Sequence, residues 1–348
     1  MDRGPWTLDQ RLQIERERMT DQLRSENFHA RLNAETWKEK VSPMQTDHIF
    51  SPSQLETYAA CPFKYFANRV LGIPQQKECS PELDADDRGT LFHDSMEIFM
   101  RENAELFLEA RENRDREPLL LEKLGETVAA VFEKSKGTYP YGHPELYEHL
   151  KQKTLHQATL VLQKELEQAR NLSAPLEPAH FEWTFGKGKS SPFEMEGLRL
   201  GGRIDRIDID PKTGHFLVLD YKTGTVNKFK AGLLEGLSLQ LPLYILAVRK
   251  LLFPNGQAVG GLLVESKVAK KKTGLVDAAF NKTHFQIHRS SHSLMKTEEM
   301  EALLQQAAQW AADYVKQIRS GFFSARPKEC KAVCDYKEIC RYAGKPFV

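Results

Sequence analysis

The sequence lacks the features that would send it out of the cell or into a membrane. No apolar run reaches the roughly 18 residues that a membrane-spanning helix needs, which excludes an ordinary membrane helix. The N-terminal segment, MDRGPWTLDQRLQIERERM, contains no apolar stretch of the kind that a secretory signal requires. We therefore expect a cytoplasmic protein.

Neither sign of charge prevails in the chain. Lysine and arginine total 49, and aspartate and glutamate total 48, so the net charge identifies no partner. Any surface that binds nucleic acid must then be a local patch rather than a global excess of positive charge. The 348 residues, 41% of them hydrophobic, suffice for one large domain or two modest ones.

Cysteine is scarce and unevenly placed. Of the five cysteines, Cys330, Cys334 and Cys340 crowd the C-terminus with the spacing C-x3-C-x5-C. In a reducing compartment such a cluster indicates metal or iron–sulfur ligation before disulfides. Cys61 would complete a four-thiolate site, and Cys79, in a polar loop, is interpreted as a spare thiol. Four thiolates can hold a [4Fe–4S] cluster or a structural zinc, and the spacing, unlike the C-x2-C of zinc knuckles, favours the cluster.

Hydrophobic periodicity predicts a helical block followed by strands. Ser51, Pro52 and Gln54 form an N-cap, a first-turn proline and a capping-box partner. The chain contains no internal repeat and no low-complexity segment, and its element order predicts an α/β or α+β core with a large helical insertion. We expect helices over residues 51–71, 89–113, two or three more to about 171, 237–253 and 298–321, and strands over 177–188, 193–210, 214–224, 258–268 and 283–288.

The segment LVLDYKTG predicts a strand that ends in a pair of opposite charges. Because side chains alternate along a strand, Asp220 and Lys222 point to one face and Tyr221 to the other. A carboxylate that holds a hard cation and a lysine that positions water are what phosphodiester cleavage requires. The alternative is an ordinary surface ion pair at a strand end.

The segment GRIDRID supplies a second carboxylate. Asp205 precedes Asp220 by 15 residues with one turn between them, so adjacent antiparallel strands could bring the two together. Two carboxylates that converge repel each other unless a cation lies between them, which predicts a Mg²⁺ site. Asp208 should face away from Asp205, and we interpret it as structural or salt-bridged.

Two predicted helices supply further candidates. His93, in GTLFHDSMEIF, has Glu97 four residues later on the same helical face. His93 is either a metal ligand or a satisfied core residue. In LSLQLPLYILA, Gln240 and Tyr244 lie one helical turn apart and could bind phosphate or hold Lys222 in place. The alternative for Tyr244 is a core aromatic with its hydroxyl at the surface.

Six segments, taken in order, resemble one family. SPSQLETYAACPFKYF, GTLFH, GRIDRID, LDYKTG, QLPLY and the late cysteine triplet resemble the RecB-like branch of the PD-(D/E)xK nucleases that carries an iron–sulfur cluster. Within that branch they resemble the C-terminal nuclease domain of AddB-type helicase–nucleases, over roughly residues 48–345. The resemblance implies a restriction-endonuclease-like core, with a central mixed sheet flanked by helices and a helical insertion between the first motif helix and the sheet.

The resemblance also implies domains and residue roles. Residues 1–47 form a helical lead-in or linker, and residues 48–348 form the nuclease domain, closed by the cysteine cluster. The catalytic residues are Asp205, Asp220, Lys222, Gln240 and Tyr244. The ligands of Mg²⁺ or Mn²⁺ are His93, Asp205, Asp220 and the carbonyl of Tyr221. The ligands of the [4Fe–4S] cluster are Cys61, Cys330, Cys334 and Cys340. The first gap of the triplet, three residues, departs from other members, whose spacing varies.

The predicted function is that of a metal-dependent DNA exonuclease in double-strand-break repair and recombination. Its substrate would be single-stranded DNA or DNA ends. GKGKSS lacks the spacing of a phosphate loop, so ATP-driven unwinding would come either from a helicase partner or from an N-terminal portion that this sequence lacks. Three alternatives stay open. They are a phosphodiesterase acting on RNA or a small nucleotide, a DNA-end binding module without its own cleavage activity, and a structural zinc protein.

Overall fold

The computed structural model describes residues 7, 9–10, 12–13, 47–74, 82–195, 197–226, 229–288, 290–328, 330 and 334–340. The chain divides into two compact units, which we call the sheet unit and the cysteine unit. The sheet unit comprises Glu78–Phe193 and Gly201–Ala308, and the cysteine unit comprises Met1–Lys77, Glu194–Leu200 and Gln309–Val348. The predicted lead-in over residues 1–47 lies almost wholly outside the described residues, as does Cys79. The domain boundary near residue 48 therefore stays a prediction.

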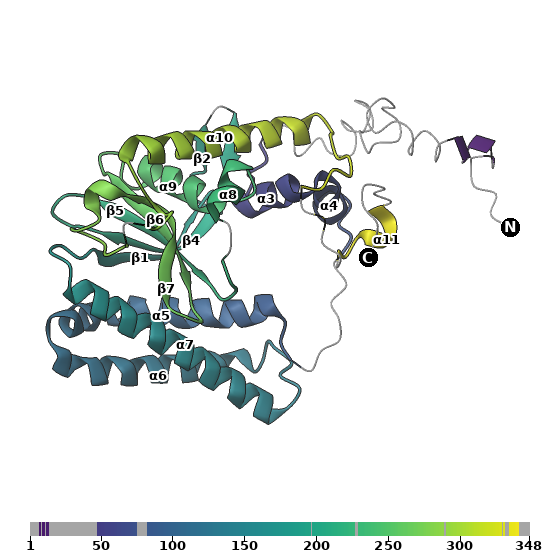
Figure 1. The fold of residues 1–348 in the computed structure, drawn as a ribbon. Coiled ribbons are helices and arrows are strands. Elements are labelled where there is room, and N and C mark those ends of the chain that lie inside the picture. The colour runs from purple at the N-terminus through teal and green to yellow at the C-terminus, as the bar shows by residue number, and fades with distance from the viewer. Residues whose placement is uncertain are drawn as a thin grey trace. The chain divides into compact units, whose positions relative to one another are not determined.

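A six-stranded mixed sheet forms the centre of the sheet unit, in the order β1-β4-β5-β6-β7-β8 (Figure 1). β5 pairs in parallel with β6, and β7 with β8, whereas the other neighbours are antiparallel. This confirms the predicted α/β class with a mixed sheet. The strands are β1 Glu177–Phe185, β4 Gly202–Ile209, β5 Phe216–Lys222, β6 Ala258–Glu265, β7 Lys270–Asp277 and β8 Leu294–Met295.

Helices cover the sheet and include the predicted insertion. α5 (Ala85–Glu112), α6 (Glu117–Ser135) and α7 (Pro144–Arg170) pack together on one side of the sheet (Figure 1). Their apolar side chains share one core with alternate residues of β5, namely Leu217, Leu219 and Tyr221. α9 (Gln240–Leu251) packs against β5 and β6. It approaches closely at Gly261, where a Cβ would lie 2.9 Å from side-chain atoms of Leu241 and Ile245.

One predicted strand is wrong. Residues 283–288 form turns and loop, because the amides of Thr283 and His284 both donate to Phe280 O, at the end of the short helix η4 (Ala278–Phe280). The place beside β7 is taken by β8, whose approach begins where Val276 N donates to Ser293 O. The other helices of this stretch are α8 (Phe229–Leu234) and α10 (Thr297–Arg319), and the residues of α10 belong to both units. No helix in the described part of the chain has the length and apolarity to cross a bilayer.

The cysteine unit contains the predicted capping box. Ser51 Oγ accepts from Gln54 N at 3.2 Å, and Gln54 Oε1 accepts from Ser51 N at 3.0 Å. The first helix ends before Cys61, and the next begins at Pro62. Cys61 itself has an extended backbone, because Pro62 disfavours helical geometry in the residue before it. The described elements that lie mostly in this unit are α3 Pro52–Ala60, α4 Pro62–Tyr65, the π-helix η2 Phe66–Val70, the hairpin of β2 Phe193–Met195 with β3 Leu198–Leu200, and α11 Lys337–Cys340.

Candidate active site

Three carboxylates on neighbouring strands form what we call the carboxylate row, Glu182, Asp205 and Asp220. The β1–β4 register places Glu182 opposite Asp205, and the β4–β5 register, continued by one residue, places Asp220 opposite Asp205 on the other side. Neighbouring strands lie about 4.8 Å apart, and like charges directly opposite one another destabilise a sheet. The row therefore needs positive charge to offset it. The predicted approach of Asp205 and Asp220 is present, with a third carboxylate beside them.

His93, on α5, joins the row at its centre. Its Nδ1 lies 3.2 Å from Asp205 Oδ2, and the same oxygen accepts a hydrogen bond from Tyr221 N at 2.7 Å. One ligand atom each from His93, Glu182 and Asp205 can be chosen so that all lie within 4.8 Å of one another. A histidine nitrogen and carboxylate oxygens at this separation can hold a divalent cation.

Asp220 and Lys222 are held together by the helix that follows them. Lys222 Nζ lies 2.6 Å from Asp220 Oδ2 and donates to Gln240 Oε1 at 2.9 Å. Gln240 Nε2 donates to Asp220 Oδ1 at 2.9 Å and lies 3.5 Å from the Tyr244 hydroxyl. Gln240 therefore links the Asp220 carboxylate to the Lys222 ammonium. This is the contact expected if Gln240 holds Lys222 in place, the second of the two predicted roles. Tyr244 is also a core aromatic, because its ring packs against Gly202 so closely that a Cβ there would lie 2.8 Å from Cε1.

The ionisation of the row reflects its excess of negative charge. Burial and the charge of Asp205 raise the pKa of Asp220 to about 6, although Lys222 opposes the shift. Burial and Asp205 also raise the pKa of Glu182 to about 7, although Arg203 opposes the shift. Burial alone would lower the pKa of His93, but the hydrogen bond and charge of Asp205 raise it above its usual value. Both carboxylic acids and the histidine therefore hold protons more tightly than they would in water.

The oxygens of the row fit a cation. Asp220 Oδ2 and Glu182 Oε2 are buried, and among the described residues neither accepts a hydrogen bond of good geometry. Their ion-pair partners are Lys222 Nζ, 2.6 Å from Asp220 Oδ2, and Arg203 Nε, 2.5 Å from Glu182 Oε2. Buried carboxylate oxygens with spare lone pairs are the ligands that Mg²⁺ and Mn²⁺ prefer.

The opposite face of the same strands carries the arginine cluster, formed by Arg206, Asp208, Glu165 and Tyr221. Arg206 donates to both carboxylate oxygens of Asp208, at 2.6 and 2.8 Å, and to Glu165 Oε2 at 2.7 Å. Its Nη1 also donates to the Tyr221 hydroxyl at 3.1 Å. All four residues are buried. The prediction that Asp208 is salt-bridged and faces away from Asp205 is confirmed, as is the opposite orientation of Tyr221.

Sequence reasoning missed Glu182. It lies in FEWTF, which matches no motif, and only the pairing of β1 with β4 shows that it faces Asp205. Its backbone has a φ of 48°, in the left-handed region that non-glycine residues rarely adopt and that recurs at functional sites. Glu97, the weaker candidate on α5, forms an ion pair with Arg101 one turn away. The register between strands was thus the signal that could have found Glu182.

The four cysteines predicted to bind a cluster form no disulfide, and all belong to the cysteine unit. Burial raises the pKa of the Cys61 thiol, and the nearby thiols of Cys334 and Cys330 raise it further. The C-terminal segment is attached beside Cys61, since Lys328 N donates to Ala60 O at 2.9 Å. Among the described residues, no three of the cysteine sulfurs lie within 4.8 Å of one another. The cluster therefore stays a prediction.

Comparisons with known proteins identify the family of the chain. The family model described as the PD-(D/E)XK nuclease superfamily matches residues 49–341. A protein of Moorella thermoacetica, named as a subunit of an ATP-dependent helicase/deoxyribonuclease, is 30% identical over 210 residues, which are 57% of this chain and 17% of the relative. Its namesake in Carboxydothermus hydrogenoformans is 26% identical over 348 residues, 84% of this chain and 31% of the relative. The chain therefore spans less than a third of these relatives' length. The resemblance drawn from the motifs is confirmed.

Proposed function

The chain belongs to the PD-(D/E)XK nuclease superfamily, and from that premise we propose that it is a Mg²⁺-dependent DNA exonuclease. The observation that carries this proposal is the carboxylate row next to Lys222, because a cation-binding set of oxygens beside a lysine is what phosphodiester hydrolysis requires. DNA as the substrate is supported by the relatives, whose names include a deoxyribonuclease.

Each residue of the site has a part in this proposal. His93, Asp205 and Asp220 hold Mg²⁺ or Mn²⁺ together with the Tyr221 carbonyl, and we add Glu182 to this set. A metal bound there polarises a phosphate oxygen and lowers the pKa of a bound water. Lys222 orients the attacking water and offsets phosphate charge. Gln240 fixes the positions of Lys222 and Asp220 by hydrogen bonds, and the Tyr244 hydroxyl helps to position the Gln240 amide.

We also propose that Cys61, Cys330, Cys334 and Cys340 bind a [4Fe–4S] cluster in a reducing compartment such as the cytoplasm. The C-x3-C-x5-C spacing of the C-terminal cysteines supports a cluster over zinc, because it differs from the C-x2-C spacing of zinc knuckles. The purified protein should be brown, with visible absorbance that oxidation removes. A colourless, zinc-loaded protein would contradict the cluster.

A helicase is the expected partner of this nuclease, and repair of DNA double-strand breaks by recombination is its expected setting. The relatives' names join a helicase to a deoxyribonuclease, which supports the pairing of the two activities. The present chain matches less than a third of those relatives and contains the carboxylate row. We therefore propose that the present chain supplies the cleavage activity and acts on ends or single strands that a helicase exposes.

The direct test is a cleavage assay on single-stranded DNA labelled at either end. Wild-type protein should degrade the DNA in Mg²⁺ or Mn²⁺ and not in EDTA. Lys222→Ala should be inert yet folded. Lys123→Ala, an exposed lysine on α6 paired with Glu126, is the matched control and should cleave like the wild type. If the wild type binds DNA but leaves it intact in every metal, the chain is a DNA-end binding module instead. Preference for RNA would contradict the proposed substrate.

A further inference from the structure

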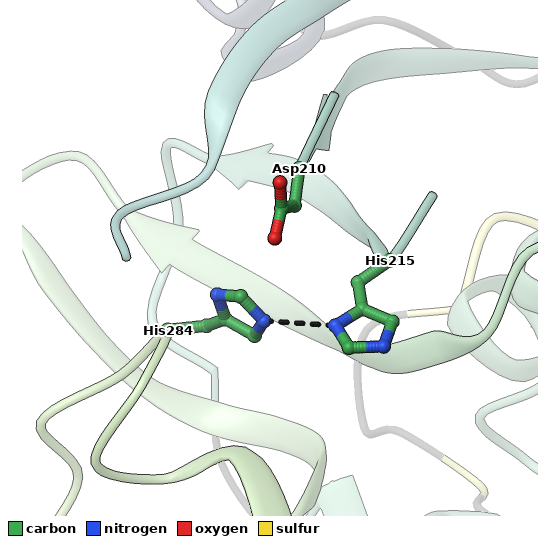
Figure 2. A group of neighbouring side chains, drawn as sticks. All are labelled: Asp210, His215 and His284. Atoms are coloured by element: carbon green, nitrogen blue, oxygen red, sulfur yellow. Dashed lines mark hydrogen bonds between the residues drawn. The ribbon is translucent and has the colours of Figure 1, made fainter. Parts of the chain in front are cut away.

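A second group of metal-binding side chains lies at the other end of the β4–β5 hairpin. Asp210 follows β4, His215 precedes β5, and His284 comes from the loop after η4 (Figure 2). One ligand atom from each can be chosen so that all three lie within 4.8 Å of one another. Asp210 and His215 are each five residues from the carboxylates of the same strands, or about 17 Å along the sheet. The group is therefore separate from the candidate active site.

The contacts of His284 fix where its lone pair points. Its Nδ1 lies 2.6 Å from the Ala174 carbonyl oxygen, which can only accept, so Nδ1 carries the proton. The Nε2 of the neutral ring then presents a lone pair, and it faces His215 Nδ1 at 3.0 Å (Figure 2). A hydrogen bond from the second ring nitrogen to a backbone carbonyl is the contact that orients metal-binding histidines.

The distance between the two imidazole nitrogens suits a cation bound to both rings as well as a hydrogen bond between them. Two nitrogens bound to one tetrahedral zinc, each at about 2.05 Å, lie about 3.3 Å apart. The observed 3.0 Å needs to widen only by a few tenths of an ångström. Phe280 packs against both rings, with centroids 4.7 Å from His215 and 5.7 Å from His284, which restrains their orientation.

Asp210 is held in place with lone pairs to spare. Its Oδ1 accepts from Lys212 N at 2.9 Å, and its Oδ2 accepts from Thr213 Oγ1 at 2.8 Å. Each carboxylate oxygen can accept a second interaction, so these bonds position the group without exhausting it. The turn is closed by Asp210 N donating to His215 O at 2.8 Å, which fixes the two ligands on the hairpin relative to each other.

We propose that Asp210, His215 and His284 form a Zn²⁺ site distinct from the nuclease centre. A set with two imidazoles and one carboxylate suits zinc better than Mg²⁺, which prefers ligand sets made mainly of oxygens. The ion joins the β4–β5 turn to the loop after η4, and through Ala174 to the segment that enters β1. Three protein ligands leave the fourth position to water.

The test compares two histidine variants of the full chain. His215→Gln keeps an N–H that can donate to His284 but is a poor zinc ligand. His288→Gln removes a neighbouring exposed histidine whose Nδ1 contacts Ser290 Oγ at 2.7 Å, outside the group. Metal-stripped, tag-free proteins are titrated with Zn²⁺ against a chromophoric chelator, and bound zinc and Tm are measured. Zinc at the cysteines or the carboxylate row contributes equally to both variants and cancels in the comparison.

Wild type and His288→Gln should each bind one zinc more than His215→Gln. Their affinity for zinc at this site should be at least about 100-fold tighter than that of His215→Gln. Zinc should also raise the Tm of wild type and His288→Gln by several degrees. Equal zinc binding by the two variants would overturn the proposal. If His215→Gln does not fold, Asp210→Asn replaces it, since an asparagine oxygen can still accept from Lys212 N. Mg²⁺-dependent cleavage should survive in His215→Gln. Lys222→Ala should keep its zinc, so failure of either proposal leaves the other testable.

Discussion

The two faces of the β4–β5 hairpin carry charged groups that are arranged in opposite ways. On one face the arginine cluster sets Arg206 against Asp208 and Glu165, with hydrogen bonds of 2.6 to 2.8 Å to both. On the other face the carboxylate row sets Asp205 beside two more carboxylates. The first group contains its own cation, Arg206, whereas the second consists of carboxylates alone. Burial alone cannot explain the difference, since Asp208 and Asp220 are both almost inaccessible to solvent.

The difference distinguishes the arginine cluster, a structural network, from the carboxylate row, a candidate binding site. In the arginine cluster the neighbouring carboxylates raise the pKa of Arg206, against the effect of burial, so its charge is favoured by its surroundings. In the carboxylate row the pKa of Asp220 rises to about 6 and that of Glu182 to about 7, so their charges are disfavoured. Carboxylates whose ionised form the fold disfavours are typical of functional sites. The following predictions test this contrast.

The largest effect on stability should come from the arginine cluster. Arg206→Met leaves Glu165 and Asp208 buried without their cation and should lower the free energy of unfolding by about 3–5 kcal/mol. Arg249→Met, which removes a two-pronged but half-exposed pair with Glu301, should cost less than about 1 kcal/mol. Urea unfolding of both variants measures the difference. Equal costs would mean that the cluster is no more structural than a surface pair.

The largest effect on activity should come from the centre of the carboxylate row. Asp205→Asn keeps an oxygen that can accept from Tyr221 N but removes a charge that a cation needs. The cleavage rate should fall by at least about 100- to 1,000-fold, as for loss of one strong electrostatic contact in a transition state. Single-turnover cleavage with saturating Mg²⁺ measures it. A variant that cleaves within about tenfold of the wild type would place the metal elsewhere.

The pH dependence of metal binding should follow the raised pKa values. A cation binds the ionised carboxylates, so its affinity falls as Glu182, with a pKa of about 7, and then Asp220, with a pKa of about 6, take up protons. Between pH 7 and pH 6 the apparent Mg²⁺ affinity should fall about tenfold or more. Cleavage rates over a range of Mg²⁺ concentrations at each pH provide the measurement. An affinity that stays constant across this range would argue against these ligands.

The smallest effect concerns the metal-free protein. Both raised acids and His93 bind more protons when folded than when unfolded, so without metal the stability should fall as pH rises through 6 and 7. At pH 8 in EDTA, Glu182→Gln should raise the free energy of unfolding by about 0.5–1 kcal/mol, because it removes a like charge opposite Asp205. At pH 5.5 Glu182 is already protonated, and the gain should vanish. A loss of stability at pH 8 would show that the Arg203 pair outweighs the repulsion.

The sequence predicted the parts of the site that local patterns determine. Alternation along a strand was enough to put Asp220 and Lys222 on one face and Tyr221 on the other. A single turn between two strands was enough to bring Asp205 to Asp220. The helical spacing of Gln240 and Tyr244 predicted their common face, and the structure shows Gln240 between Asp220 and Lys222. All of these relations span few residues, or one hairpin.

What the sequence could not predict depends on pairing between distant strands. Glu182 reaches the site only because β1 pairs with β4 in a register that includes a bulge between Pro178 and His180. β7, with three consecutive lysines that no predicted strand included, forms because β6 offers it an edge. Residues 283–288 alternate like a strand, yet the edge they would occupy belongs to β8. In each case the neighbouring strand, rather than the sequence of the segment itself, determines whether the segment joins the sheet and in which register.

The account depends most on the claim that the carboxylate row binds a divalent cation, and Mn²⁺ titration followed by electron paramagnetic resonance tests this most directly. The comparison uses wild type, Asp205→Asn and a matched control, Asp313→Asn, on the exposed face of α10, where Asp313 accepts from Gln309. At pH 8 the wild type and Asp313→Asn should bind Mn²⁺ equally, and Asp205→Asn should bind it at least about tenfold more weakly. Equal affinity in all three proteins would contradict the account.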